Sequence, residues 1–208
     1  MVAVSIDMLT PDVLSTHKRI IVSKPLALNA RKYLLLAAVI TLLVFSSNAS
    51  SETQWDVEYL PSDEYEQAFG IGVYQSKTDG FGFYGNLQVT LSDREPKYDS
   101  LNVSSYGDPV TERYKDITIF NVGITKRLSS NLNTYAGVGY AVSRAVAKKN
   151  DPFNILGSDG DYYVDDPAND ESGGNLNAGI LLGVGKVVFN FGYHSFTSSP
   201  YIGVGGSF

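Results

Sequence analysis

The chain has 208 residues, no cysteine and 18% charged residues, whereas about a quarter of an average soluble domain is charged. It also carries 20 Gly, 14 Tyr and 10 Phe. The length fits one domain with a targeting segment, and the lack of cysteine excludes disulfides, thiolate metal sites and a cysteine nucleophile.

Residues 1–49 have the composition of a secretory leader. Basic residues, the last of them Arg31 and Lys32, precede an uncharged run at 33–45 and the small-residue site Ser47-Asn-Ala49. This order predicts a signal peptide cleaved after Ala49, with a domain at 50–208. An uncleaved anchor is the alternative, although the run is shorter than the ~20 residues of a spanning helix. The long basic region means that the leader is extended or that translation starts downstream.

Cleavage there would leave an acidic protein. The chain has 16 Lys and Arg and 22 Asp and Glu; five of the former and two of the latter lie in 1–49. The remainder therefore holds 11 basic and 20 acidic residues, a net charge of −9. We expect no nucleic-acid partner, because phosphate contacts come from Lys and Arg.

The rest of the chain alternates between apolar and polar residues with the two-residue period of β-strands. The pattern is clearest at 81–91. At 115–127 Ile117 and Ile119 are out of phase, which suggests a bulge or a later strand start. The predicted strands are 53–60, 68–76, 81–91, 115–127, 132–145, 175–184, 187–196 and 200–208.

The connections between these strands differ in length in a regular way. The second, fourth and sixth are tight turns, whereas the third and fifth are long polar loops at 92–114 and 146–174. Long connections therefore fall on one end of an antiparallel up-and-down meander. This is the pattern of outer-membrane barrels, which have short periplasmic turns and longer outer loops.

The polar face of the strands separates a membrane barrel from a soluble one. It carries Gly, Asn, Gln, Thr and Tyr, whereas a face in water should carry Lys, Glu and Asp. We predict an all-β fold, an eight-stranded antiparallel up-and-down transmembrane β-barrel whose polar lumen is filled by side chains. A soluble barrel that binds a small ligand in the periplasm, or a soluble β sandwich, is the alternative.

Two groups of residues have predicted structural roles in such a barrel. Asp56 and Glu58 lie on the inward register with Arg127, which predicts an ion pair in the lumen, because a buried charge needs a partner. Aromatic residues near strand ends or on the apolar register predict two girdles at the membrane interfaces. These are Trp55, Tyr59, Phe81, Tyr140, Phe189, Tyr193 and Phe208.

The chain resembles the small OmpA/OmpX-type outer-membrane β-barrels of Gram-negative bacteria. The resemblance covers nearly all of 53–208 and rests on the strand pattern, on Tyr135-Ala-Gly-Val-Gly-Tyr140 and Phe191-Gly-Tyr193, and on the terminal Phe208. It implies recognition by the barrel-assembly machinery through Ile202, Val204 and Phe208, from which Gly206 departs. It also implies a monomer in the outer membrane, in contact with lipid and lipopolysaccharide.

One residue pair suggests chemistry. His194 and Ser195 could belong to a lipid-modifying enzyme, an acyl hydrolase or transferase. Neighbouring residues of a strand point to opposite faces, however, so the pair lacks the geometry of nucleophile and base. We therefore predict no enzyme and no catalytic residue.

An acidic run crowds the second long loop. It comprises Asp159, Asp161, Asp165, Asp166, Asp170 and Glu171. The run lacks the ligand order of a calcium loop, so we interpret it as solvated and expect no metal or cofactor. Divalent ions that bridge it to lipopolysaccharide phosphates are a further hypothesis. The predicted function is structural or surface-interacting, with the two long loops displayed outside the cell.

Overall fold

The computed structural model describes residues 51–92, 94, 96, 108–153 and 160–208. Within them the chain forms nine strands and a short 3₁₀ helix. Their bounds are β1 Ser51–Leu60, β2 Ala68–Lys77, β3 Phe81–Thr90, β4 Val110–Arg127, β5 Leu132–Asn150, β6 Asp161–Asp165, η2 Pro167–Asn169, β7 Glu171–Val184, β8 Val187–His194 and β9 Ser199–Ser207. The predicted leader at 1–49 lies outside the described residues. No helix among those described is long and apolar enough to cross a membrane.

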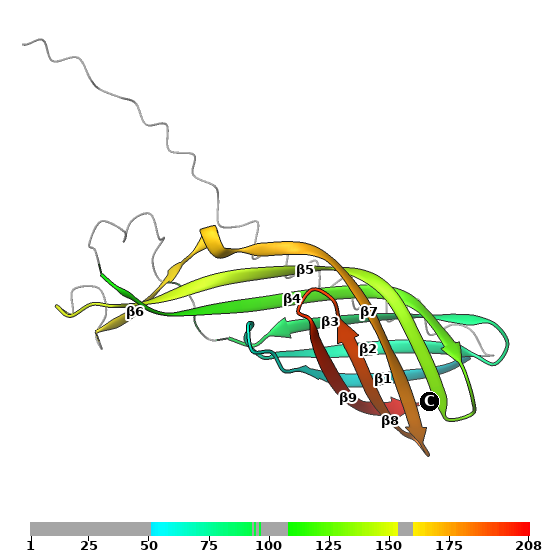
Figure 1. Ribbon diagram of the computed structural model, residues 1–208. Coiled ribbons are helices and arrows are strands. Elements are labelled where there is room, and N and C mark those ends of the chain that lie inside the picture. Colours follow the sequence, from blue (N-terminus) through cyan, green and yellow to red (C-terminus); the bar gives the residue numbers. More distant parts are fainter. Residues whose placement is uncertain (1–50, 93, 95, 97–107, 154–159) are drawn as a thin grey trace, which may run out of the picture. The chain divides into compact units, whose positions relative to one another are not determined.

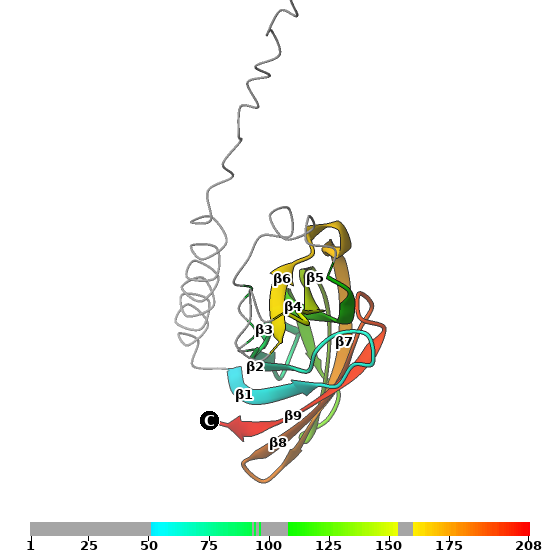
Figure 2. The ribbon, with the colours of Figure 1, turned by 90° about the vertical axis from the view of Figure 1, so that its left-hand side faces the viewer.

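Eight of the strands close into an antiparallel barrel (Figures 1 and 2). Each of β1 to β5 pairs with the next, β5 pairs with β7, and β7, β8 and β9 follow in order. The first and last strands complete the ring, with Val57 opposite Val204. The predicted fold class, an eight-stranded antiparallel barrel, is confirmed.

The two ends of the barrel differ in their connections. Tight turns join β2 to β3, β4 to β5 and β7 to β8 at the end that also holds Ser51 and Phe208; we call this the turn end. Gly80 and Gly185 adopt positive φ angles of 113° and 65° in two of these turns, where the missing Cβ makes that backbone conformation inexpensive. The opposite end, with the longer connections, is the loop end.

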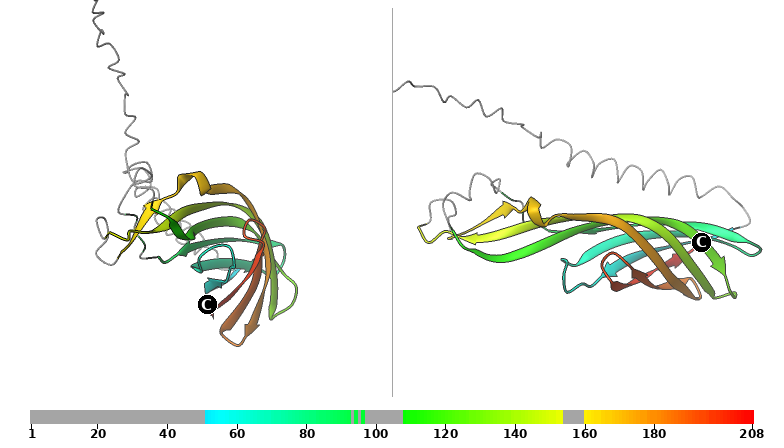
Figure 3. Two further views of the ribbon diagram at one scale, coloured as in Figure 1. Left: turned by 60° about the vertical axis from the view of Figure 1, so that its left-hand side comes forward. Right: turned by 45° about the horizontal axis from the view of Figure 1, so that its top comes forward.

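The long loops predicted at 92–114 and 146–174 are partly strand, so their predicted bounds were wrong. β4 begins at Val110 and β5 runs to Asn150, past the ends of the neighbouring strands (Figure 3). The short strand β6 then pairs with the outer part of β5, with Val164 opposite Ala147. These segments carry Glu112, Arg113, Lys148 and Lys149, so the apolar alternation that marks the other strands stops where the sheet leaves the barrel.

The strand at Ile117 and Ile119 neither bulges nor starts late, so both predictions for this position were wrong. Pairing with β5 is continuous from Glu112 to Arg127, and the two isoleucine side chains are at most 1% exposed. They point inward because the barrel interior is apolar at the loop end. Their layer also contains Leu60, Tyr65, Ala68 and Ala141, with Phe196 packed against it.

Candidate functional site

The outer face of the barrel is an apolar belt. Side chains that point outward from β1 to β5 and β7 to β9 are large, hydrophobic and exposed, whereas charges are concentrated beyond the belt at both ends. Its members include Val57, Ile71, Phe83, Val122, Ile124, Val138, Leu176, Ile180, Phe191, Ile202 and Val204. A soluble monomer rarely exposes a continuous apolar surface of more than a few hundred Å².

The aromatic residues predicted as girdles all lie on this outer face, in two groups. Trp55, Phe81, Phe189 and Phe208 are near the turn end, and Tyr59, Tyr140 and Tyr193 are in the loop-end half of their strands. Phe208 is the most exposed of them, at 78%. The belt therefore carries aromatic side chains toward both edges.

The interior of the barrel is polar and is centred on Glu58. Its carboxylate accepts hydrogen bonds from Tyr74 Oη at 2.6 Å, Gln88 Nε2 at 2.6 Å and Asn86 Nδ2 at 3.0 and 3.1 Å. Asp56 accepts one from Asn190 Nδ2 at 2.6 Å. Both carboxyl side chains are 0% exposed, so amide and phenol donors replace the water that a carboxylate would otherwise bind.

The structure does not bring Arg127 to these two carboxyl groups, which corrects the predicted lumen ion pair. Arg127 lies at the turn end of β4, where Nη1 is 3.3 Å from Glu52 Oε2 and the guanidinium donates to the carbonyls of Ser129 and Ser130. Four to six residues of β1 separate Glu52 from Asp56 and Glu58, or roughly 13–20 Å at the rise of a strand. Inward register alone does not place two residues at the same height.

Four buried tyrosines fill the middle of the barrel. The rings of Tyr74 and Tyr84 stack with centroids 5.5 Å apart, and each lies 5.0 Å from Tyr135. The hydroxyls of Tyr135 and Tyr201 are hydrogen-bonded at 2.7 Å. The packed rings leave the centre occupied by side chains, as expected for a barrel of eight strands.

His194 belongs to this interior network. Nδ1 accepts from the amides of Asn175 and Asn177 at 2.9 and 3.1 Å, and Nε2 donates to Gln88 Oε1 at 3.0 Å. The imidazole is 0% exposed and stacks on Tyr201 with centroids 4.4 Å apart. Both ring nitrogens are occupied by structural hydrogen bonds.

Ser195 lies on the opposite face of the chain from His194. Its hydroxyl accepts from the backbone N–H of Leu176 at 2.7 Å. The imidazole of His194 is hydrogen-bonded to Asn175, Asn177 and Gln88, whereas the Ser195 hydroxyl contacts Leu176 and Asn175. The described hydrogen bonds therefore do not join the two residues as nucleophile and base.

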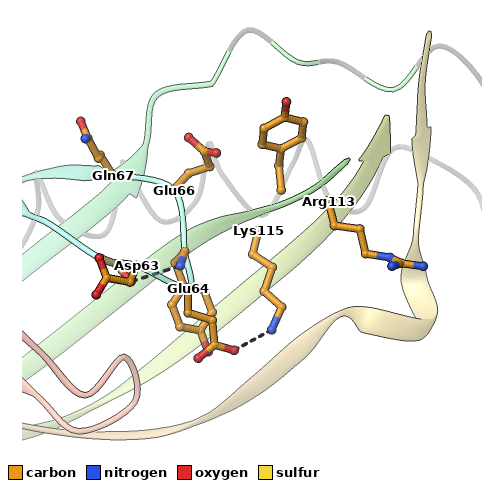
Figure 4. A pocket seen from close by; sticks show the side chains of 9 residues that line it. Asp63, Glu64, Glu66, Gln67, Arg113 and Lys115 are labelled. Atoms are coloured by element: carbon orange, nitrogen blue, oxygen red, sulfur yellow. Dashed lines mark hydrogen bonds and ion pairs between the residues drawn. The ribbon is translucent and has the colours of Figure 1, made fainter. Parts of the chain in front are cut away.

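A pocket of about 340 Å³ lies at the loop end, between the β1–β2 connection and the outer part of β4 (Figure 4). Glu64 and Lys115 point toward one another across it, and Lys115 Nζ lies 2.8 Å from Glu64 and 2.7 Å from Glu171. Tyr65 Oη donates to Glu171 at 2.9 Å. Partial burial, together with this carboxylate, raises the pKa of Tyr65 to about 12.

These contacts hold the 61–67 connection against the barrel mouth. The backbone N–H of Glu66 donates to the Lys115 carbonyl at 2.9 Å, and the rings of Tyr65 and Phe196 are 5.9 Å apart. Four charged residues that line the pocket form ion pairs: Glu64 with Lys115, Glu66 with Arg94, and Arg113 with Asp166. These ion pairs hold the connection over the apolar layer below it.

The acidic run in the second long loop lies at the surface, where Asp161, Asp170 and Glu171 are exposed, and several of its members form ion pairs with basic side chains. Arg113 contacts Asp166 at 3.1 Å, Lys148 contacts Asp161 at 2.9 Å, and Arg144 contacts Asp165. Asp159 lies outside the described residues. Among those described, no group of three or more His, Asp or Glu side chains could hold a metal ion.

Several residues of the interior escaped the sequence-based reasoning. Gln88, Asn86, Asn190 and Tyr74 were predicted only as members of a polar face, yet they hold Glu58. Their positions in the two-residue alternation of each strand predict that they point into the barrel and are buried. Their positions along the barrel axis, which decide which side chains are in contact, depend on the stagger between strands.

No protein-family model and no curated protein sequence matches the chain. Among solved structures, Ail, the attachment invasion locus protein of Yersinia pestis, is 13% identical, with a TM-score of 0.42, over 76% of this chain and 97% of that one. Its complex with the heparin analogue sucrose octasulfate aligns at 14% identity and the same TM-score. Neisserial surface protein A, NspA, is 10% identical, with a TM-score of 0.32, over 76% of this chain and 92% of that one.

The barrel architecture of this chain is established by its own strand pairing. It is the architecture of the small OmpA/OmpX-type barrels that the sequence resembles.

Proposed function

We propose that the protein is a non-enzymatic barrel of the outer membrane of a Gram-negative bacterium, exported by a cleaved signal peptide, that displays a charged sheet at the cell surface. The observation that carries the proposal is the reversed distribution of polarity. The exposed side chains of the barrel wall are apolar, and Glu58, Asp56 and His194 are enclosed inside.

A lipid bilayer accounts for both faces. The belt gains from contact with acyl chains, and the closed ring leaves no strand edge whose backbone groups would meet hydrocarbon unpaired. The soluble alternative would place the whole belt in water and is therefore disfavoured.

Display is the role that the loop end supports. The outer parts of β4 and β5, together with β6, continue the barrel wall as a sheet braced by the Arg113, Arg144 and Lys148 ion pairs. Loops carried on a rigid scaffold commonly serve in binding. In the cell, lipopolysaccharide would surround the outer part of the monomer, and the assembly machinery would recognise Ile202, Val204 and Phe208.

Membrane residence is tested by fractionation of cells that express the protein, followed by electrophoresis of heated and unheated samples. We expect the protein in the outer-membrane pellet and a change of mobility on heating, because a folded barrel resists detergent until it is heated. A protein that stays dissolved in the periplasmic fraction would overturn the proposal.

The enzymatic alternative is tested on the purified barrel with lipopolysaccharide. We expect no released or transferred acyl chain from either the wild-type protein or His194→Ala. Acyl release that is lost in His194→Ala would replace display with lipid modification.

A further inference from the structure

The turn end carries three lysines that form no ion pair within the part of the chain that the structure describes. Lys77 ends β2, Lys126 lies near the end of β4, and Lys186 is in the turn between β7 and β8. We call these three residues the basic rim.

The turn end contains few acids that could compensate the basic rim. Among the described residues there, Glu52 is already paired with Arg127 at 3.3 Å, which leaves Asp79 and the terminal carboxylate of Phe208 to face the three lysines. At the loop end, by contrast, Arg113, Lys115 and Lys148 each contact a carboxylate. The basic rim is therefore a local excess of positive charge at one edge of the apolar belt.

One lysine of the rim lies against an aromatic side chain of the belt, and the backbone of a second is close to another aromatic residue. Lys126 Nζ is 5.0 Å from the ring centroid of Phe81, which is 56% exposed. Lys186 adjoins Trp55 across Gly206: a Cβ on that glycine would lie 3.4 Å from the Lys186 carbonyl oxygen and 3.5 Å from Trp55 Nε1. Aromatic rings and lysine stems are suited to the depth where acyl chains meet headgroups.

We infer that the basic rim is a binding surface for the headgroups of net anionic phospholipids in the leaflet at the turn end. This inference rests on the proposed membrane location. Lysines near an anionic lipid surface each favour binding by on the order of fivefold. A zwitterionic headgroup has no net charge, so its electrostatic attraction to the same ammonium groups is weaker.

The fluorescence of Trp55 tests the inference locally, because the chain contains one Trp. The barrel is reconstituted in vesicles that contain brominated phosphatidylglycerol or brominated phosphatidylcholine, and quenching by each lipid gives its relative occupancy beside Trp55. We expect phosphatidylglycerol to be favoured about fivefold at low salt and less as salt is added.

Variants separate charge from other effects. Lys186→Gln should bring the preference close to one, and Lys186→Arg should retain it. Lys148→Gln, which removes a lysine at the loop end, should leave it unchanged. Heat-dependent mobility on a gel verifies that each variant is folded.

The possible outcomes divide the two proposals. Equal quenching of the wild-type protein by both brominated lipids would overturn the inference that the basic rim binds anionic headgroups. It would leave the proposed membrane location unaffected. A preference that persists in Lys186→Gln would also overturn the inference. No quenching by either lipid would contradict membrane residence itself.

Discussion

Glycine and tyrosine share the inward-facing positions in the middle of the barrel, and each requires the other. A Cβ on Gly192 would lie 2.2 Å from the ring of Tyr201, and one on Gly179 would lie 2.2 Å from the hydroxyl of Tyr135. The large rings fill the lumen only because the positions that face them lack side chains. The high content of both residues in the sequence follows from this packing.

Neighbouring glycines of β9 should respond differently to the same substitution. A Cβ on Gly205 would lie 1.7 Å from the backbone oxygen of Trp55, whereas one on Gly206 finds ordinary contacts beside the indole. We expect Gly205→Ala to cost on the order of 2–3 kcal/mol of unfolding free energy. Gly206→Ala should stay within about 0.5 kcal/mol. Urea unfolding from lipid vesicles measures both, and equal losses would contradict the geometry.

Glu58 should be sensitive to replacement of its carboxyl group by an amide of the same shape. In the described hydrogen bonds at this carboxyl group, Glu58 is always the acceptor, and Tyr74, Asn86 and Gln88 donate. The Gln88 amide cannot rotate to present its oxygen to Glu58 instead, because that oxygen accepts from His194. Glu58→Gln places an N–H₂ against these donors, so we expect a loss of about 3 kcal/mol in urea unfolding.

Asp56→Asn is the matched control for that substitution. Asp56 is equally buried, but the side-chain hydrogen bond described at its carboxyl group is the one from Asn190, and the new amide keeps an oxygen for it. We expect a loss of about 1 kcal/mol. A larger effect at Asp56 than at Glu58 would show that donor count does not govern the interior.

At the scale of elements, β6 illustrates a strand held by charge as well as by an apolar face, since Tyr162 and Val164 are buried with Ala147 in a small cluster. It pairs with the outer part of β5, and Lys148 and Asn150 both hydrogen-bond Asp161. These contacts hold the pKa of Asp161 below its usual value. The ionised carboxylate therefore stabilises the hairpin.

Acid should loosen this hairpin before the barrel. A carboxyl group with a lowered folded pKa stabilises fully above its unfolded value, about 3.9, and the contribution disappears as pH falls through the folded value. We expect amide protection of Tyr162–Asp165, corrected for intrinsic exchange, to fall below about pH 4. Asp161→Asn should lose that acid-dependent component, and protection that falls equally in this variant would assign it to another group.

At the scale of the whole molecule, the last residue closes the ring. Phe208 N donates to the Thr53 carbonyl at 3.0 Å, and Thr53 N donates to the Phe208 carbonyl at 3.3 Å, while the ring of Phe208 points outward. The backbone of this residue serves closure, and its side chain is free for another role.

Phe208→Ala should separate stability from assembly. The backbone bonds persist, so we expect the purified barrel to unfold within about 1 kcal/mol of wild type. The amount of heat-shifting protein in the outer membrane of cells should fall severalfold if Phe208 is the assembly signal. Phe189→Ala, at the same end and on the same face, is the control and should assemble normally; equal defects in both variants would contradict a signal role.

Much of the barrel was predictable because the alternation of apolar and polar residues within each strand shows which side chains point inward and which point outward. The parity of Asp56 and Glu58 predicted an inward position, where both are buried, and the tight turns at Gly80 and Gly185 were marked by their residues. Where the wall leaves the belt, around Glu112 and Lys148, charged residues interrupt the alternation, although Ala147, Tyr162 and Val164 form a buried apolar cluster there. The strand pattern disappears there although the strand continues.

The sequence by itself determined the number of barrel strands, their approximate limits and which side chains face in or out, because alternation is a local property of an extended chain. Only the tertiary structure decided that Glu58 meets Gln88 and Asn86, that Arg127 pairs with Glu52, and that loop acids find Lys115 and Arg113. Those contacts depend on the stagger of strands around a closed ring, to which every turn contributes. That stagger is a property of the whole sheet and of no single segment.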